Sequence, residues 1–195
     1  MTYGRPLGYD PDKALDAAMH LFWLQGYEAT SLNDLLNAMG LSKSSLYQGF
    51  GGKKELFGRC INRYCDTYAG MFLDRLNKAE SGHSFIEETL LMAANEARRS
   101  EFRRGCLLVN TASEFAQKDP AIAEHVSIGL NRFRGVFLAA VTRGQRDGDI
   151  TTTVDADLLA SYLMSSMGGL KTVVKGGADE QKVKDIVGVI LRALE

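Results

Sequence analysis

The sequence has little of several features that would narrow its function class. Its 195 residues include only three cysteines, at irregular spacing, so neither a disulfide framework nor a zinc site is predicted. The uninterrupted apolar runs are only a few residues long, too short to cross a membrane, and the N-terminus lacks the apolar core of a signal peptide. We therefore expect a protein without a membrane partner, located in the reducing cytoplasm.

Patterns typical of catalysis are also missing. The three histidines, His20, His83 and His125, are isolated from one another in the sequence. No Ser/His/Asp arrangement, phosphate-binding loop or metal-ligand spacing accompanies them. We therefore expect no catalytic residues, no bound metal and no cofactor. A helical enzyme with an apolar substrate pocket is accordingly the least favoured interpretation.

The charge balance gives no indication of a nucleic-acid ligand. The formal net charge is −1, and residues 1–60 contain six basic and six acidic side chains. If this region binds DNA, a few locally placed cations must be responsible, because the bulk charge is too small.

Apolar residues recur at three- and four-residue spacing along almost the whole chain, which is the helical period. The pattern predicts an all-α fold of about nine helices, with expected bounds 11–25, 32–39, 43–49, 53–78, 85–99, 106–117, 120–146, 156–174 and 180–194. Capping residues support these ends, with Asp10 before the first helix and Gly26 after it. Short helices are concentrated before Lys53, so we expect one domain over residues 1–52 and a second over 53–195.

The stretch from Thr30 to Phe57 predicts a helix-turn-helix. Two short helices are separated only by Gly40-Leu41-Ser42, and a turn this tight needs the dihedral freedom of glycine. The second helix then presents short hydroxyls, an amide, a phenol and a lysine, which suit close contacts in a DNA groove. These side chains belong to Lys43, Ser44, Ser45, Tyr47 and Gln48. From the spacing alone, any other helical hairpin remains the alternative.

The segment from about Lys13 to Phe57 closely resembles the DNA-binding domain of the TetR family of repressors. The matching residues fall in order at fixed spacing: Ala14-Leu15, Leu21-Phe22, Gly26-Tyr27, Thr30-Ser31, Gly40-Leu41-Ser42, Leu46-Tyr47, Phe50, Lys53 and Glu55-Leu56-Phe57. The sequence departs from the family at Leu36, where alanine is usual, at Ser44, where glycine is common, and at Gly49, where an aromatic residue or histidine is common. The resemblance implies a homodimeric repressor that binds a palindromic double-stranded DNA operator and is released by an inducer.

The resemblance also implies roles for individual residues. Four side chains would face base edges or nearby phosphates: Lys43, Ser44, Ser45 and Gln48. Tyr47 and Thr30 would contact phosphates through their hydroxyls, and Lys53 would add its charge to a helix N-terminus against another phosphate. Arg5 would reach a minor groove from a basic arm. Gly49 removes one ring that usually faces the DNA backbone.

Aromatic residues and methionines are frequent after Lys53, and such side chains make adaptable apolar walls for a cavity. The expected apolar lining of an inducer site consists of Tyr64, Tyr68, Met92, Phe133, Phe137 and Met167, with core packing as the alternative for each. The expected polar lining consists of Glu96, Asn110 and Lys171.

The apolar lining indicates a small apolar inducer, and Cys106 indicates an electrophilic one. This cysteine follows Arg103, Arg104 and Gly105 at the expected start of a helix, where cations and the helix N-terminus both stabilise a thiolate. A small buried residue at a tight helix junction is the alternative. The run Gly105 to Leu108 also resembles a segment of several TetR-family proteins, a few of which sense electrophiles or oxidants through this cysteine.

The last two helices predict the dimer contact, because both are apolar over wide faces. These faces consist of Leu159, Leu163, Met167, Leu170, Val183, Ile186, Val187, Ile190 and Leu194. Paired with a second copy, they would form a four-helix bundle around a two-fold axis. A helical adaptor that binds protein partners and no DNA remains the alternative to a repressor.

Overall fold

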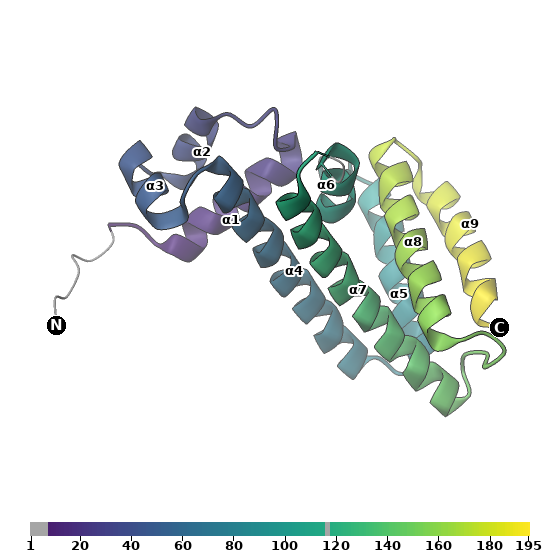
Figure 1. Cartoon of the computed structure of the whole chain (residues 1–195). Helices are drawn as coiled ribbons and strands as arrows, with labels where there is room; N and C mark the ends of the chain where they lie inside the picture. Colours follow the sequence, from purple (N-terminus) through teal and green to yellow (C-terminus); the bar gives the residue numbers. More distant parts are fainter. Residues whose placement is uncertain (1–7, 116–117) are drawn as a thin grey trace, which may run out of the picture. The chain divides into compact units, whose positions relative to one another are not determined.

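The chain folds into helices throughout the part described by a computed structural model, residues 8–115 and 118–195 (Figure 1). These are α1 (Pro11–Gln25), α2 (Leu32–Met39), α3 (Lys43–Phe50), α4 (Lys53–Lys78), α5 (Gly82–Ala97), α6 (Leu107–Phe115), α7 (Pro120–Asp147), α8 (Ala156–Lys175) and α9 (Glu180–Leu191), with 3₁₀ turns at Ser100–Phe102 and Arg192–Leu194. The all-α prediction is confirmed. Among these residues, no helix is both long and apolar enough to span a membrane.

The start of α5 differs from the sequence prediction. The stretch from Glu80 to His83 was expected to separate two helices, yet α5 already begins at Gly82. Ser81 and Ser84 form a capping box, in which each side chain accepts a hydrogen bond from the other residue's backbone N–H, at 3.1 and 3.0 Å. This reciprocal cap satisfies backbone donors that would otherwise lack partners, so the helix starts earlier.

The described residues divide into two compact units, one over residues 1–64 and the other over 65–195. The division falls inside α4. The predicted boundary after residue 52, at the start of this helix, stays a prediction.

The N-terminal unit is built around aromatic side chains from α1 and α4. Phe22 is 1% exposed and its ring lies 4.8 Å from that of Phe57, in an edge-to-face arrangement. Burying an aromatic side chain of this size stabilises the fold by about 1.5–3 kcal/mol. On the solvent side, Arg63 of α4 donates to both carboxylate oxygens of Asp16 in α1, at 2.8 and 3.0 Å. The first and fourth helices are thus joined by a buried contact and a bidentate ion pair.

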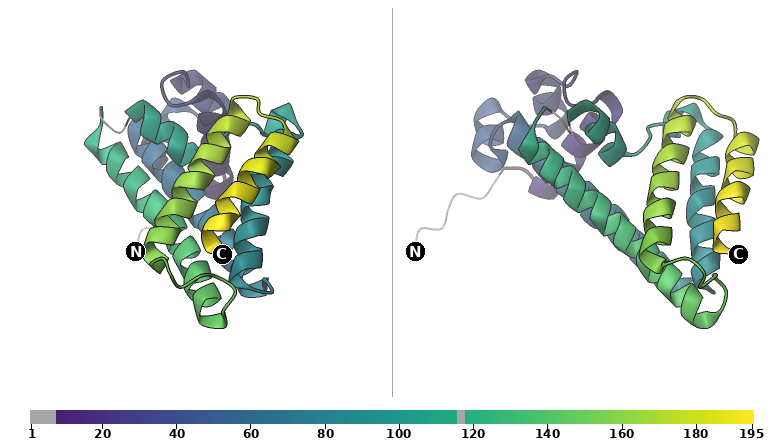
Figure 2. Two further views of the ribbon diagram at one scale, coloured as in Figure 1. Left: turned by 90° about the vertical axis from the view of Figure 1, so that its right-hand side faces the viewer. Right: turned by 45° about the vertical axis from the view of Figure 1, so that its right-hand side comes forward.

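The C-terminal unit is a bundle in which α5 is the central helix (Figure 2). It packs against α7, α8 and α9, and α7 packs along α8. Phe85, Ile86 and Leu90 of α5 are at most 1% exposed. Its buried positions recur at three- and four-residue spacing, so they form one broad stripe that faces the neighbouring helices.

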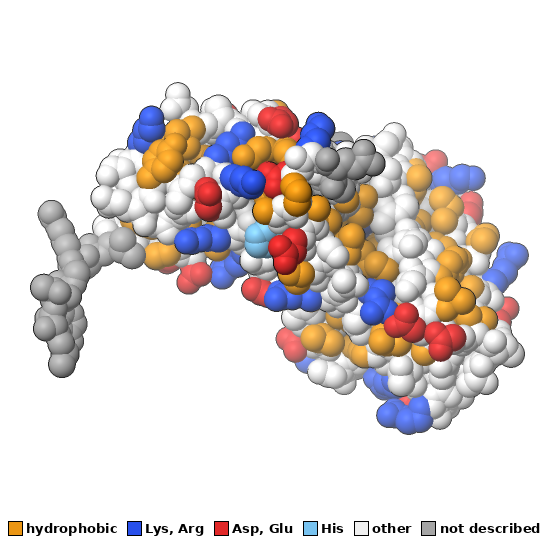
Figure 3. Space-filling view, viewed as in Figure 1, with side chains coloured by type: hydrophobic (Ala, Val, Ile, Leu, Met, Phe, Trp, Pro, Cys, Tyr) orange, Lys and Arg blue, Asp and Glu red, His pale blue; other side chains and the backbone are white. Residues whose placement is uncertain are grey.

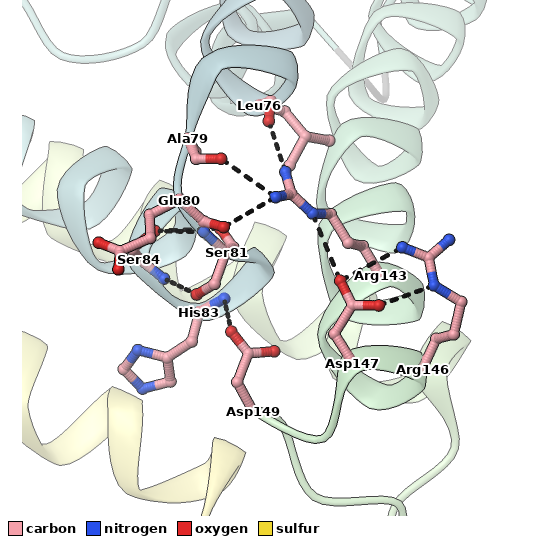
Figure 4. Close-up of polar contacts among 10 residues, drawn as sticks. All are labelled: Leu76, Ala79, Glu80, Ser81, His83, Ser84, Arg143, Arg146, Asp147 and Asp149. Carbon is pink, nitrogen blue, oxygen red and sulfur yellow. Dashed lines mark hydrogen bonds and ion pairs between the residues drawn. The ribbon is translucent and has the colours of Figure 1, made fainter.

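The turn between α4 and α5 is fixed by one arginine from α7 (Figure 4). Arg143 donates to the carbonyl oxygens of Leu76, Ala79 and Glu80, at 2.9, 3.1 and 2.9 Å. These carbonyls lie at or just after the C-terminal end of α4, where backbone acceptors lack partners within the helix. Asp149, just beyond α7, accepts from the His83 N–H at 3.1 Å. We call the arginine and its three acceptors the Arg143 clamp.

Candidate functional site

Helix α3 presents one buried face and one polar face. Leu46 and Phe50 anchor it in the N-terminal unit, at 0% and 3% exposure. Its N-cap, Ser42, accepts from the Ser45 N–H at 3.1 Å, which starts the helix directly after the turn. The exposed side chains are Lys43, Ser44, Tyr47 and Gln48, while Ser45 is half-buried. Four of the five residues predicted to contact DNA from this helix are therefore on the surface.

The turn between α2 and α3 has the form that the sequence predicts. Gly40 has φ +64°, in the left-handed region that glycine adopts without steric cost. The Leu41 N–H donates to the Leu36 carbonyl at 3.0 Å, closing the end of α2. Leu41 itself is buried, so the three-residue turn is held by packing as well as by its backbone. The pair of helices is thereby rigidly joined, as a helix-turn-helix requires.

Tyr47 and Lys53 lie on either side of the turn that joins α3 to α4. Tyr47 is 50% exposed, although it is a large aromatic residue. Lys53 is the first residue of α4, and its ammonium group lies 4.2 Å from the ring centroid of Tyr27. A cation held over an aromatic face at a helix N-terminus is a favourable place for a phosphate oxygen.

The expectation for Thr30 is corrected by its burial. Thr30 is 0% exposed, and its hydroxyl donates to the Gly26 carbonyl at 2.6 Å, so its side chain has no surface to offer a phosphate. The next residue, Ser31, is exposed and caps α2 by accepting from the Asp34 N–H at 3.1 Å. The signal for Ser31 was present in the sequence as a Ser-x-x-Asp capping box.

Charge on the visible face is mixed rather than gathered into one basic patch. Figure 3 shows basic and acidic side chains interspersed over the face that it draws. The near-zero net charge likewise indicates that any attraction for a polyanion would depend on individual cations such as Lys43 and Lys53. Arg5, the predicted arm residue, lies outside the described residues.

Most of the predicted inducer-site residues belong to the C-terminal unit. Phe133 and Phe137 of α7 are buried at 8% and 5% exposure, and the ring of Phe133 lies 6.1 Å from that of Phe72 in α4. Met167 of α8 is half-buried against the main core. Met92 of α5 lines an open cavity of about 680 Å³ together with Glu96, and the Arg75 guanidinium donates to its sulfur at 3.0 Å.

The predicted polar residues are held in contacts between helices. Glu96 of α5 forms an ion pair with Lys171 of α8, with side chains 27% and 17% exposed. Asn110 of α6 accepts from the Lys175 ammonium and donates to the Arg104 carbonyl, both at 3.0 Å. Burial raises the pKa of the Tyr68 phenol, the charge of Arg104 lowers it, and that of Glu96 raises it further. Tyr68 is thus close enough to both charges to interact with them.

Tyr64 and Cys106 have surroundings that the sequence did not reveal. Tyr64 belongs to the N-terminal unit, where its ring meets that of Trp23 edge-on at 5.1 Å. Cys106 is half-buried immediately before α6, and its carbonyl accepts from the Asn110 N–H at 2.9 Å. Burial raises the pKa of the nearby Cys65 thiol to about 11, with a further contribution from Cys106. Cys106 is therefore the most accessible of the three thiols.

The apolar faces that were expected to contact a second copy are mostly buried within the protomer. This corrects the predicted dimer surface for Leu159, Leu163, Leu170, Val183, Val187, Ile190 and Leu194, which are all at most 5% exposed. The large apolar side chains that α8 and α9 leave exposed are Leu158, Tyr162, Val173 and Val189.

Two family models match the chain, and the first ends close to the boundary between the two compact units. Residues 14–60 match the family described as "Bacterial regulatory proteins, tetR family". Residues 85–187, more than half of the chain, match the family described as "Tetracyclin repressor-like, C-terminal domain". The chain belongs to the TetR family of bacterial transcriptional regulators. Its function is therefore regulation of transcription through DNA, and it is not an enzyme.

Individual TetR-family proteins resemble the chain over almost its whole length. It is 32% identical over 190 residues to the repressor ComR of Escherichia coli strain K12, covering 97% of this chain and 90% of ComR. It is 29% identical over 193 residues to the regulator YezE of Bacillus subtilis strain 168, covering 98% and 100%. A cysteine-substituted variant of the regulator CifR, solved with 26-bp double-strand operator DNA, has 31% identity and a TM-score of 0.85, covering 98% and 100%.

Proposed function

We propose that this TetR-family protein represses transcription by binding, as a homodimer, to a palindromic operator, and that a small apolar or electrophilic inducer releases it. The observation that carries the proposal is the polar face of α3, exposed next to a rigid glycine turn. Repression is the direction described for ComR, to which the chain is 32% identical. Binding to chromosomal DNA places the protein in the bacterial cytoplasm.

In this proposal α3 lies in the major groove. Lys43, Ser44 and Gln48 reach base edges or adjacent phosphates, because their short or flexible polar ends project from the exposed face. Tyr47 donates its hydroxyl to a phosphate and Lys53 adds charge, while the half-buried Ser45 contributes at the edge of the contact. Ser31 takes the phosphate role first expected of Thr30, since its backbone lies at the N-terminus of α2. Arg5 remains a proposed minor-groove contact.

The homodimer uses the residual apolar surface of α8 and α9. Leu158 and Val189 are 62% and 58% exposed, values that are costly for aliphatic side chains in water. A two-fold axis beside these helices brings each surface against its copy, as in an isologous interface. The two copies of α3 are then related by the same axis, so the DNA site has two-fold symmetry.

The inducer site is the region of the C-terminal unit where Tyr68, Met92, Phe133 and the Glu96–Lys171 pair are found. The thioether and rings supply adaptable apolar walls, and the ion pair supplies polar groups that a ligand engages by displacing one partner. Asn110 and Phe137 extend the polar and apolar lining, with Met167 beside α8. An electrophile instead modifies Cys106, which is half-buried immediately before α6.

Selection of bound DNA tests the proposal. The full-length protein is incubated with fragments of the genome that encodes it, and the enriched fragments are footprinted. We expect a protected palindrome whose half-site centres are about one helical turn, or a multiple of it, apart. Transcription from the adjacent promoter should rise when the regulator gene is deleted. Asymmetric protected sites would contradict the dimer, and a fall in transcription would make the protein an activator.

A further inference from the structure

We propose that Tyr9, which precedes α1, donates its hydroxyl to the DNA backbone on the flank of α3 where Gly49 offers no side chain. This inference rests on the proposed role of α3 as the reading helix. It adds a contact residue from a segment outside the helix-turn-helix itself.

The first observation is that Tyr9 occupies the space of the missing side chain. A Cβ atom built on Gly49 would overlap the Tyr9 hydroxyl oxygen, and would lie 3.5 Å from Cζ of the same ring. Gly49 is in the last turn of α3, whereas Tyr9 is separated from it by two helices in the sequence. The phenol oxygen is thus located where a side chain at position 49 would begin.

The second observation is that the phenol is held in this position by its neighbours. The Tyr9 ring packs on the buried ring of Phe50, with centroids 6.2 Å apart. The following residue, Asp10, caps α1 by accepting from the Asp12 N–H at 3.0 Å, which fixes the backbone next to Tyr9. Tyr9 is half-buried, so its ring packs while part of the side chain remains accessible. A donor that is already oriented loses little entropy when it binds.

The third observation is that Tyr47 and the Tyr9 hydroxyl lie on opposite sides of the exposed face of α3. Successive residues of a helix are about 100° apart, so Tyr47 and Gly49 lie on opposite sides of Gln48. Gln48 is in the middle of the exposed face of α3. A helix in the major groove has a phosphate backbone on each side. Tyr47 therefore faces one strand, and the Tyr9 hydroxyl, located at position 49, faces the other.

The electrostatic surroundings favour an anion beside the Tyr9 hydroxyl. Arg59 of α4 reaches this end of α3, where its guanidinium donates to the Gly49 carbonyl at 2.8 Å and lies over the ring of Phe50. Its positive charge is therefore held at the same end of α3 as the phenol. A neutral O–H donor supported by a nearby cation suits a phosphate oxygen.

The alternative role for Tyr9 is packing alone, and Tyr9→Phe separates the two because it keeps the ring. Dissociation constants are measured for the full-length protein with a duplex that the wild type selects from a random-sequence library, and with a scrambled duplex. We expect Tyr9→Phe to weaken binding to both duplexes by about tenfold, since a backbone contact carries no sequence information. The salt dependence and the melting temperature should not change, because a neutral hydroxyl releases no counterion and the ring is retained.

Gly49→Ala is the second variant, and it displaces the hydroxyl without altering Tyr9. The added methyl group needs the space of the phenol oxygen, so binding should weaken as much as in Tyr9→Phe. The melting temperature should change little, because the better helix propensity of alanine offsets the cost of shifting the Tyr9 ring on Phe50. The double variant should bind no more weakly than either single variant, since both remove the same contact.

Three results would overturn the proposal: full affinity in Tyr9→Phe, a loss accompanied by a matching fall in melting temperature, or losses that multiply in the double variant. Lys53→Ala and Gln48→Ala, measured beside them, identify a failure of the reading helix itself. If those two variants bind normally, the proposed DNA surface is wrong. If they bind weakly while Tyr9→Phe binds normally, only the role of Tyr9 is wrong.

Discussion

Replacing Val189 by aspartate tests whether the exposed part of α9 contacts a second copy. Val189 is 58% exposed, so the aspartate is solvated in the protomer and its free energy of unfolding should change by no more than about 0.5 kcal/mol. In the proposed dimer, the two-fold axis buries one unpaired carboxylate from each copy, at about 3–5 kcal/mol each. Two such charges cost roughly 6 kcal/mol or more, which raises the dimer dissociation constant by about four orders of magnitude.

Two matched aspartate variants control for other effects of the charge. Ile190, the next residue, is 5% exposed in the core, so Ile190→Asp loses its packing, about 2–5 kcal/mol, and buries a charge in addition. Because total stabilities are about 5–15 kcal/mol, this variant should unfold. Leu24 of α1 is 64% exposed, so Leu24→Asp should change neither folding nor assembly.

Sedimentation equilibrium at micromolar concentration reports the assembly, and thermal melting followed by circular dichroism reports the fold. We expect Val189→Asp to be a folded monomer, Ile190→Asp to be unfolded and Leu24→Asp to be a folded dimer. A Val189→Asp protein that sediments as the wild-type dimer does would refute the proposed surface. A folded Ile190→Asp protein would refute the description of the core.

Further variants and conditions test the DNA surface, the accessible thiol and one ion pair. Lys53→Ala should weaken binding to all duplexes alike and lower the slope of the salt dependence by roughly one, because a phosphate contact is lost. Gln48→Ala should change which sequences are preferred, and equal losses on selected and scrambled duplexes would exclude base reading. Iodoacetamide should modify Cys106 first, since burial protects the other two thiols and raises their pKa. Peptide mapping that finds Cys60 or Cys65 labelled as fast as Cys106 would contradict this order. The hydrogen bonds from Arg98 and then Lys184 lower the pKa of Glu180 from its ordinary 4.5 to about 2. The stability that this carboxylate contributes is therefore complete above pH 4.5 and is lost as the pH falls toward 2. In Glu180→Gln, the free energy of unfolding measured with urea should depend less on pH in that window. The same pH dependence as in the wild type would contradict this role of Glu180.

The helix positions were largely predictable because helix ends depend on local residues. Asp10 caps α1 through the side-chain oxygen that the sequence indicates, and Gly40 has the positive φ that ends α2. Each of these interactions joins residues only two to five positions apart. A pattern of such short range is fully visible in the sequence.

The partner of each apolar face was not predictable, because that information is not local. Leu163 and Ile190 have the helical spacing of a contact surface, but the spacing is the same whether the surface meets its own bundle or a second copy. The contact between Tyr9 and Gly49 was not predictable either, since it joins two segments far apart in the chain. The phosphate contact expected of Thr30 was wrong by one position in the sequence. The Thr30 side chain is buried, whereas that of the next residue, Ser31, caps α2.

The Arg143 clamp has a consequence for how the sequence can change in evolution. Surface turns usually tolerate inserted residues, because few of their backbone groups are engaged. The turn from Ala79 to Ser81 is short and lies at the surface, yet two of its carbonyls and the last turn of α4 share one guanidinium. An inserted residue here would move those acceptors out of reach and leave Arg143 half-buried without them. Length variation among relatives should therefore avoid this turn and be found instead between α8 and α9.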